Sequence, residues 1–206
     1  MKLGLISDVH CAYDTLKETL AEFSDQVDEV LLAGDALYEY RFNNEVIELI
    51  REHQIRYILG NHEEVLLGPH GKRALSAPFV KAANVDFVRT IGTHLETVID
   101  GKRLLMAHGS PWAPHNQYVH ANSSVLERTS SLGVDFLVLG HTHIPMEVRI
   151  GHTLVVNPGS LEQSRERGQQ GCISYAVLDT AEGAVEFHRR PITRRTEAAV
   201  TSRVAG

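Results

Sequence analysis

The chain has 206 residues, of which 43% are hydrophobic and 22% are charged, as is typical of a globular protein with one domain. Its formal net charge of −6 argues against general nucleic-acid binding, since such proteins are usually basic. No apolar run approaches the roughly 20 residues of a membrane-spanning helix, no signal peptide is recognisable, and two cysteines are too few for a disulfide framework. We therefore predict a cytoplasmic protein with no membrane partner.

Strands and helices are predicted to alternate in the first third of the chain. Apolar runs predict strands over Lys2–Ser7, Glu29–Asp35 and Ile55–Glu63. Between them, apolar residues at helical spacing predict one helix over Tyr13–Phe23 and another over Asn43–His53, which begins with an asparagine N-cap. This order indicates parallel βαβ units.

The second half is predicted to consist mainly of short strands. Thr93–Gly109 predicts a β-hairpin that turns at Asp100-Gly101, and Ser123–Leu132 predicts a helix. Five further apolar runs predict strands of a mixed or antiparallel sheet: Phe136–Gly140, Met146–Ile150, His152–Asn157, Cys172–Asp179 and Ala184–Arg190. We place one domain over residues 1–190 and a loose C-terminal tail over residues 191–206.

Metal-capable residues follow several of the predicted strands. They are Asp8, His10, Asp35, Asn61, His108, His141 and His143. Sites in open α/β sheets form at the carboxyl ends of strands. The two i, i+2 pairs in this set are each predicted to point to one side if the chain stays extended there. Several of these residues are preceded by glycines, which would admit close approach of the backbone.

Seven donors are too many for one tetrahedral zinc ion and suit two divalent ions that share a carboxylate. Mixed oxygen and nitrogen ligation favours Mn, Fe, Zn, Co or Ni over Ca. Two such ions bind the attacking and the leaving oxygen in a phosphoryl transfer. Two ions (+4) and two aspartates (−2) leave a charge of +2, which attracts a phosphate ester even to an acidic protein. Each fragment alone is as readily a turn, a cap or a surface histidine pair, but five fragments in series favour a metal centre.

The ordered motifs SDVH, AGDALY, GNHE, AHGSP and GHTH resemble those of the calcineurin-like metallophosphoesterases, and in particular their small bacterial and archaeal single-domain phosphodiesterases. The resemblance extends from Met1 to about Asp179, through VVNPGS and SYAVLD. It implies a four-layer α/β/β/α sandwich, in which helices flank two packed mixed β-sheets.

The resemblance also implies a role for each metal-capable residue. Asp8, His10 and His143 would hold one ion, Asn61, His108 and His141 the other, and Asp35 would bridge the two. Mn²⁺ or Fe is favoured, and Zn²⁺, Ni²⁺, Co²⁺ or Mg²⁺ is compatible. A metal-bridging hydroxide is expected to attack phosphorus in line while His62 protonates the leaving oxygen as a general acid. The alternative for His62 is a residue that orders its turn.

Three departures from the family pattern bear on this site. Glu63 replaces an aspartate that is expected to orient the catalytic histidine. Cys11 stands where glycine is common, either as a small core residue or as an oxidation-sensitive thiol. Ala36–Asn44 replaces a loop rich in Gly and Pro, and its Arg41 is a candidate substrate-binding residue, with a solvated loop as the alternative.

Two other loops offer candidate substrate contacts, each with an equally good structural explanation. They are Trp112, His115, Asn116 and Tyr118 on one loop and Arg165 and Arg167 on another.

The expected function is hydrolysis of a phosphate ester, most plausibly a phosphodiester, by a dinuclear metal enzyme. Two alternatives stay open. One is a protein serine/threonine phosphatase or a nucleotidase of the same superfamily. The other is a non-catalytic protein-binding scaffold, as in the retromer subunit that has this fold. The motifs do not specify the natural substrate, the native metal or the oligomeric state.

Overall fold

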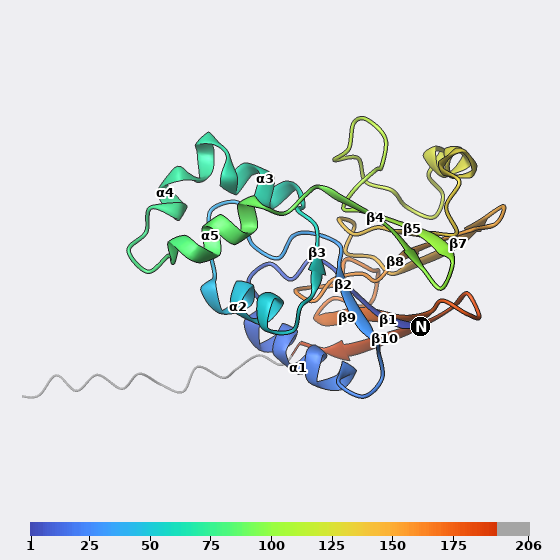
Figure 1. The fold of residues 1–206 in the computed structure, drawn as a ribbon, viewed down its shortest axis with the longest axis horizontal. Coiled ribbons are helices and arrows are strands. Elements are labelled where there is room, and N and C mark those ends of the chain that lie inside the picture. The colour runs from blue at the N-terminus through green and yellow to red at the C-terminus, as the bar shows by residue number, and fades with distance from the viewer. Residues whose placement is uncertain (193–206) are drawn as a thin grey trace, which may run out of the picture.

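The computed structural model describes residues 1–192, in which two five-stranded sheets pack against each other (Figure 1). The first sheet has the order β10-β9-β1-β2-β3. Its strands are β1 (Lys2–Ile6), β2 (Glu29–Leu32), β3 (Arg56–Tyr57), β9 (Cys172–Asp179) and β10 (Ala184–Pro191). β1, β2 and β3 are parallel, as the βαβ pattern predicted, and β9 runs antiparallel to both β1 and β10.

The second sheet has the order β4-β5-β6-β8-β7. Its strands are β4 (His94–Ile99), β5 (Lys102–Ala107), β6 (Phe136–Val138), β7 (Met146–Ile150) and β8 (Thr153–Asn157). β5, β6 and β8 are parallel, whereas the edge strands β4 and β7 are antiparallel to their neighbours. β4 and β5 form the predicted hairpin around Asp100-Gly101. Both sheets are therefore mixed, which confirms the expected fold class.

Helices cover the outer faces of the two sheets. They are α1 (Tyr13–Phe23), α2 (Asn44–Glu52), α3 (Asn61–Leu67), α4 (Lys72–Leu75), α5 (Ala82–Arg89), and the 3₁₀ segments η1 (Pro69–Gly71) and η2 (Ser124–Leu132). Figure 1 shows α1 and α2 beside the first sheet and α3, α4 and α5 as a group beyond β3. None of the helices in residues 1–192 is long and apolar enough to cross a membrane.

Three apolar clusters account for this layering. Leu5, Leu31, Met106 and Val156 belong to the cluster between the sheets. The outer face of the first sheet packs against the buried side of α1, where residues such as Leu16 recur at helical spacing. A smaller cluster lies under η2 on the outer face of the second sheet. Parallel strands buried on both faces account for the near-continuous apolar runs in the sequence.

The strand registers place several carboxyl ends together. Ile6 pairs with Leu32, which pairs in turn with Tyr57, so β1, β2 and β3 end side by side. In the second sheet, Met106 pairs with Val138, and Val138 with Val156. The metal-capable residues of the sequence follow these ends. The fold thus brings residues that are more than a hundred positions apart to one edge of the sandwich.

Several predicted element boundaries were wrong. The third strand is short, and Asn61 to Glu63 belong to α3 rather than to a strand end. Ser124–Leu132 is a 3₁₀ segment, and β10 continues through Pro191, where we had placed the start of the tail. We predicted no element for the segment between α3 and β4, which contains η1, α4 and α5. The rest of the predicted tail, residues 193–206, lies outside the described residues.

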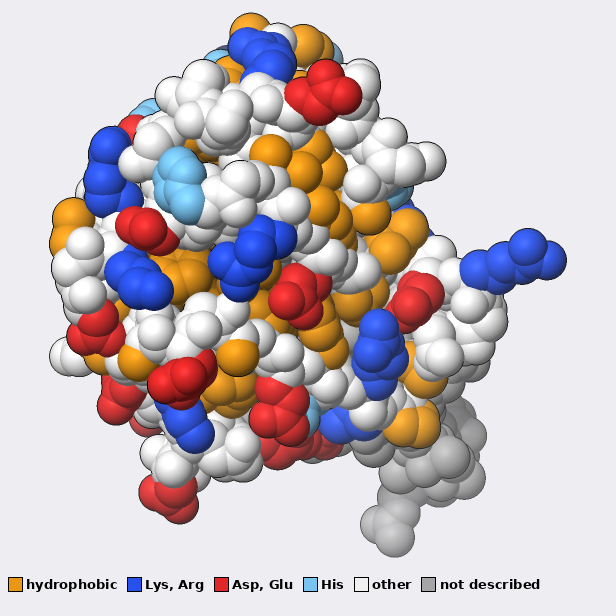
Figure 2. Space-filling view, turned by 90° about the vertical axis from the view of Figure 1, so that its right-hand side faces the viewer, with side chains coloured by type: hydrophobic (Ala, Val, Ile, Leu, Met, Phe, Trp, Pro, Cys, Tyr) orange, Lys and Arg blue, Asp and Glu red, His pale blue; other side chains and the backbone are white. Residues whose placement is uncertain are grey.

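The side of the molecule to the right in Figure 1 is shown face-on in Figure 2. Hydrophobic side chains form a band across this face, with charged side chains of both signs scattered around it. No large patch of one charge dominates this side. A surface of mixed charge fits the modest formal net charge of −6.

Candidate metal centre

The seven predicted metal-capable residues lie on turns directly beyond the strands. Asp8 follows β1 and Asp35 follows β2, whereas Asn61 begins α3 just after β3. His108 follows β5, and the GHTH segment follows β6. The structure brings all of these turns together, and six of the seven side chains are buried, Asn61 being partly exposed.

The backbone of this centre differs from the extended geometry that we predicted. Five of its residues have positive φ angles: Asp8 (52°), His10 (44°), Asp35 (54°), His141 (70°) and His143 (57°). Non-glycine residues rarely adopt this left-handed conformation, which costs of the order of 1–3 kcal/mol each. Turns at each residue, and not an i, i+2 alternation, therefore aim the side chains. Backbone hydrogen bonds brace these turns, for example from Asp8 N to Gly34 O (3.1 Å) and from His10 N to Asp35 O (3.0 Å).

Two glycines permit the close approach of these turns, as the sequence predicted. A Cβ added at Gly60 would lie 2.1 Å from Asp35 Oδ1, and one at Gly140 would lie 2.1 Å from Ser7 Oγ. Neither position has room for a side chain. The motif glycines are thus required by packing between the turns.

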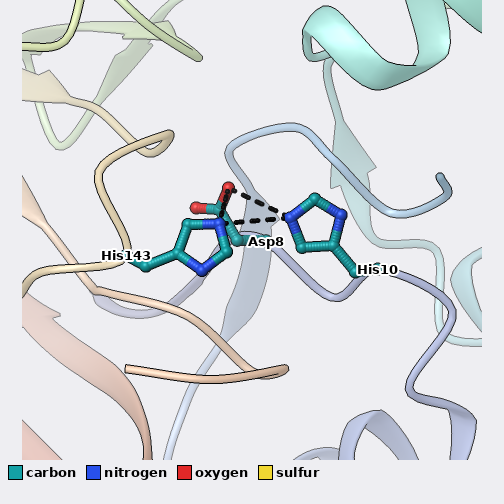
Figure 3. Close-up of side chains that lie close together, drawn as sticks. All are labelled: Asp8, His10 and His143. Atoms are coloured by element: carbon teal, nitrogen blue, oxygen red, sulfur yellow. Dashed lines mark hydrogen bonds and ion pairs between the residues drawn. The ribbon is translucent and has the colours of Figure 1, made fainter. Parts of the chain in front are cut away.

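One group of donors consists of Asp8, His10 and His143 (Figure 3). The Nε2 atoms of the two histidines lie only 3.2 Å apart, and Asp8 Oδ1 lies 3.2 Å from His143 Nε2. Asp8 Oδ2 accepts hydrogen bonds from Ser7 Oγ (2.7 Å) and His141 N (3.0 Å). Within residues 1–192, Asp8 Oδ1 has no hydrogen-bond partner although it is buried. A buried carboxylate oxygen without a donor, facing two imidazole nitrogens, fits a bound cation.

The second group consists of Asp35, His108 and His141, with Asn61 beside them. His108 Nε2 lies 3.0 Å from Asp35 Oδ2 and 3.1 Å from Asn61 Oδ1. Asp35 Oδ2 is also 3.8 Å from His10 Nε2, which belongs to the first group. The Asp35 carboxylate therefore lies between the two groups.

Backbone carbonyls fix the ring orientation of three histidines. His143 Nδ1 bonds to Gln163 O (3.0 Å), His108 Nδ1 to Ala33 O (2.7 Å), and His141 Nε2 to Asn116 O (3.1 Å). A carbonyl only accepts, so these nitrogens carry a hydrogen, and the opposite nitrogen of each ring is the one left to bind a ligand. This arrangement is typical of metal-binding histidines. Together with oxygen donors and no thiolate, the residues fit divalent cations of intermediate hardness.

The crowding of carboxylates and imidazoles shifts their pKa values strongly. Burial alone would lower the pKa of His108, but the charges of Asp35 and Asp8 raise it to about 10. Burial and the neighbouring His108 lower the pKa of His141 to about 4. The aspartate pKa values fall below their ordinary range against the effect of burial, chiefly through His143 at Asp8 and His108 at Asp35. The two carboxylates are thus charged and require positive partners.

The VVNPGS segment braces the GHTH turn from behind. Asn157 Nδ2 donates to Gly140 O (2.6 Å) and to Thr142 Oγ1 (3.1 Å), and Ser160 Oγ donates to Asp8 O (2.9 Å). The loop that follows supplies backbone and not arginine contacts, because Arg165 N donates to His143 O (3.0 Å). This motif therefore positions the metal-capable residues without touching the centre itself.

His62 lies at the exposed side of the centre. Its ring meets that of His10 edge to face at 4.8 Å, and its Nε2 lies 3.8 Å from Asp35 Oδ2. Its Nδ1 contacts the carboxylate of Glu39. A carboxylate accepts, so Nδ1 carries a hydrogen and Nε2 is the atom directed to the centre.

The expected contact between Glu63 and His62 is wrong. Glu63 is fully buried and accepts hydrogen bonds from the backbone N–H groups of Asp35 (3.1 Å), Leu37 (2.6 Å) and Gly60 (2.8 Å). Burial and the charge of Asp35 raise the pKa of Glu63 to about 7, although the N–H groups of Leu37 and Gly60 oppose the shift. Glu63 therefore ties β2 to the start of α3. No sequence pattern indicated Glu39, because only the fold brings it to His62.

The remaining candidates are spread around the centre. Tyr118 stacks on His141 with 4.0 Å between ring centroids. Tyr38, which belongs to the Ala36–Asn44 loop, stacks on His10 at 4.6 Å. His115 and Asn116 line a cavity of about 340 Å³ that reaches Asn61 and His108, whereas Trp112 packs under Arg128. Arg167 is exposed. Arg41 is also exposed, and it lines a different cavity in which none of the seven donors takes part.

Cys11 is a buried small residue next to the centre. Its Sγ lies 3.4 Å from Arg41 O, and burial raises the pKa of its thiol to about 11. A thiol with so high a pKa is a poor nucleophile. Its burial and raised pKa fit the interpretation of Cys11 as a core residue. Cys11 links the turn of Asp8 and His10 to the Tyr38–Arg41 turn.

Comparison with known proteins gives a consistent result. The family model of the calcineurin-like phosphoesterase superfamily domain matches residues 1–183. An uncharacterized protein of Methanocaldococcus jannaschii is 24% identical, over 91% of this chain and 86% of its own length. A phosphodiesterase of the same organism is 26% identical, over 77% of this chain and 83% of its own.

Among solved structures, a metallophosphoesterase from Sphaerobacter thermophilus has the same fold. The two structures match with a TM-score of 0.70 and 23% sequence identity, and the match covers 92% of this chain and 88% of the Sphaerobacter chain. The family match, the two mixed sheets and the buried group of aspartates and histidines agree with one another. The protein is a phosphoesterase and belongs to the calcineurin-like phosphoesterase superfamily.

Proposed function

We propose that this chain is a dinuclear metal-dependent phosphodiesterase. The observation that supports it best is the position of Asp35, whose carboxylate lies between two groups of donors. A shared carboxylate is what two adjacent cations require. The phosphodiesterase of Methanocaldococcus jannaschii, with which the chain shares 26% identity, supports the choice of a diester.

The donors divide into two sets in this proposal. Asp8, His10 and His143 would hold one ion, Asn61, His108 and His141 the second, and Asp35 both. When bound, the ions would supply a water of lowered pKa and neutralise charge on the phosphoryl oxygens. We favour Mn²⁺ or Fe, with Zn²⁺, Ni²⁺, Co²⁺ or Mg²⁺ compatible with the donors.

His62 acts as the general acid in this proposal. Its Nε2 faces the centre, and Glu39 holds Nδ1 on the opposite side of the ring. A protonated imidazole is a proton donor, so Nε2 can deliver a proton to a departing alkoxide. Glu39 is a positioning residue in this scheme. The predicted cytoplasmic location and phosphate-ester substrate belong to the same proposal.

A substrate panel on metal-reconstituted protein tests the proposal. We expect bis-(p-nitrophenyl) phosphate to be hydrolysed only with added metal, and faster than p-nitrophenyl phosphate or a phosphopeptide. Asn61→Ala, which removes one donor, should lower this activity and the amount of bound metal. Faster turnover of the phosphopeptide would instead indicate a protein phosphatase. Metal-free, inactive protein that still binds a partner would indicate a scaffold.

A leaving-group comparison tests the role of His62. His62→Ala should reduce the rate much more for an alkyl ester than for a nitrophenyl ester, because nitrophenolate departs with little protonation. Bound metal should equal that of the unmodified protein. Equal losses on both esters would exclude the general-acid role, and loss of metal would make His62 a ligand, as its place near His10 and Asp35 also permits.

A further inference from the structure

A second cavity, of about 450 Å³, lies between the Tyr38–Arg41 turn and the segment that contains α4. Its lining includes three aromatic rings and three basic side chains: Tyr40, Phe42, Phe79, Arg41, His70 and Arg73. None of the seven metal-capable residues takes part in it. Cavities of this size hold a small organic ligand.

The basic side chains of this cavity have no counter-ions in the part of the chain that the structure describes. Within residues 1–192, Arg41, Arg73 and His70 form no ion pair and no side-chain hydrogen bond, although Arg89 and Lys81 nearby in sequence are paired with Asp86 and Glu48. Both arginines are charged at any ordinary pH. In a chain with a net charge of −6, two unpaired arginines beside one cavity mark a place for an anion.

The aromatic rings indicate the second half of the ligand. Tyr40 is 65% exposed and Phe79 is 63% exposed, which makes them two of the most exposed large apolar side chains in the described residues. Flat, exposed rings beside unpaired arginines offer stacking faces for a planar group.

The walls of the cavity are held in place by polar contacts. Tyr38 and Arg41 pair through backbone hydrogen bonds of 3.4 and 3.3 Å, and Cys11 Sγ binds Arg41 O. On the opposite wall, Asn44 Nδ2 donates to Phe79 O (2.8 Å) and Asn44 Oδ1 accepts from Lys81 N (3.0 Å). The backbone of both walls is therefore in place before a ligand arrives, which reduces part of the entropic cost of binding.

We propose that this cavity is a binding site for a nucleoside phosphate, separate from the metal centre. The base stacks against Tyr40 and Phe79, and the phosphate groups bind Arg41 and Arg73. This assignment does not depend on the reaction proposed for the metal centre. It gives Arg41 a ligand other than the phosphoryl group that is hydrolysed.

Calorimetric titration of the metal-loaded, full-length protein tests the proposal. The probe is adenosine 5′-(α,β-methylene)diphosphate, in which the bridge between the phosphorus atoms resists hydrolysis. Phe79→Ala and Arg73→Ala each should weaken binding by about tenfold or more, since one removes a stacking face and the other an anion contact. Both residues are exposed, so these variants should fold normally.

Lys72→Ala is the matched control. Lys72 precedes Arg73 on α4 and carries the same charge, but it lines a neighbouring groove instead of this cavity. The affinity of the Lys72→Ala variant for the probe should stay within about twofold of that of the unmodified protein. Equal affinity in all four proteins would place the ligand elsewhere, for example at the metals, and overturn the proposal. Absence of binding would also overturn it, as would binding of orthophosphate as tight as that of the nucleotide.

Hydrolysis of bis-(p-nitrophenyl) phosphate by the same four proteins separates this proposal from the proposed function. The rates should agree within about twofold, because none of the three substituted residues lies in the metal centre. An inactive unmodified protein would refute the phosphodiesterase and leave the nucleotide site untouched.

Discussion

The metal centre and the Tyr40–Phe79 cavity are built in opposite ways, although one short segment contributes to both. In the metal centre, Asp8, Asp35 and His143 are at most 3% exposed, and their turns adopt left-handed conformations. In the cavity, Tyr40 and Phe79 are more than 60% exposed, and the arginines have no partners within the described residues. Residues 35 to 41 connect the two regions, since Asp35 lies in the metal centre and Arg41 lines the cavity.

This difference shows where the chain tolerates change. The metal centre is tightly braced, since Asp8, His108 and His143 are each held by a hydroxyl or a backbone carbonyl and His10 stacks on Tyr38. A small displacement of one turn therefore disturbs several donors. The cavity depends on a few exposed side chains that the rest of the fold does not need. Substitutions at the two places should therefore differ greatly in effect, and the predictions below test that contrast.

The largest effect is expected from Gly60→Ala. The new methyl group would lie 2.1 Å from Asp35 Oδ1 and 2.6 Å from Asp35 N, so the Asp35 carboxylate has to move. We expect bound metal to fall and kcat/KM to drop by about 10²-fold, which is the scale of a 1 Å misplacement in a catalytic site. Metal analysis and a diesterase assay measure both.

Gly92→Ala is the control for this substitution. Its nearest neighbour would be His94 O at 3.5 Å, an ordinary contact, so activity and bound metal should hardly change. If Gly60→Ala behaved like Gly92→Ala, the close packing of the turns would not be needed for metal binding. That outcome would contradict the expectation that the metal centre is more sensitive to substitution than the surface.

A smaller effect is expected from Glu39→Gln, which probes the residue that joins the two regions. The amide keeps the size of the side chain but loses its charge, so His62 should be held less firmly through Nδ1. We expect kcat on an alkyl diester to fall roughly tenfold, as is usual when a positioning partner of a histidine is altered. Bound metal should not change.

Substrates with a good leaving group provide the diagnostic readout for Glu39. A nitrophenyl ester should lose less rate than the alkyl ester, because the general-acid role that we propose for His62 matters little there. Glu45→Gln, at an exposed position on α2, removes the same charge away from His62 and should leave both rates unchanged. Equal losses on both esters would assign Glu39 a structural role only.

The sequence was sufficient to predict which residues converge but not how they are held. The donors were identified because each follows an apolar run, and strand ends of α/β sheets meet at one edge. Their left-handed turns could not be predicted, since Asp and His, although enriched at positive φ, still adopt negative φ far more often. Hydrogen bonds from distant segments fix these conformations. Burial and long-range hydrogen bonds determine the conformation of these turns, and sequence periodicity contains no information about either.

Glu39, Glu63 and the helices after β3 show the same limit in other forms. In the sequence, Glu39 is an ordinary polar residue of a loop. The fold brings it into contact with His62, which lies 23 positions later in the chain. Glu63 looked like a partner for its neighbour, but helix geometry turns it inward to cap three N–H groups. α4 and α5 were missed because short helices with few buried residues show little periodicity.

The smallest effect is expected at Asn43, which borders both regions. Asn43 Oδ1 accepts from Val46 N (3.1 Å) as the N-cap of α2, and its Nδ2 lies 3.4 Å from Cys11 O in the first metal turn. Asn43→Ala should lower the free energy of unfolding by about 1 kcal/mol, which for a domain of this size is roughly 2–4 °C in Tm. Thermal unfolding measures the shift.

Asn43→Asp separates the two hydrogen bonds, because aspartate keeps the cap but cannot donate to Cys11 O. If the cap accounts for the loss, this variant should recover most of the Tm while Asn43→Ala does not. Neither variant should change bound metal or diesterase activity, since the turns of the metal centre have their own braces. Loss of activity in both variants would mean that the centre depends on the Asn43–Cys11 contact, and hence that the two regions are coupled and not separately built.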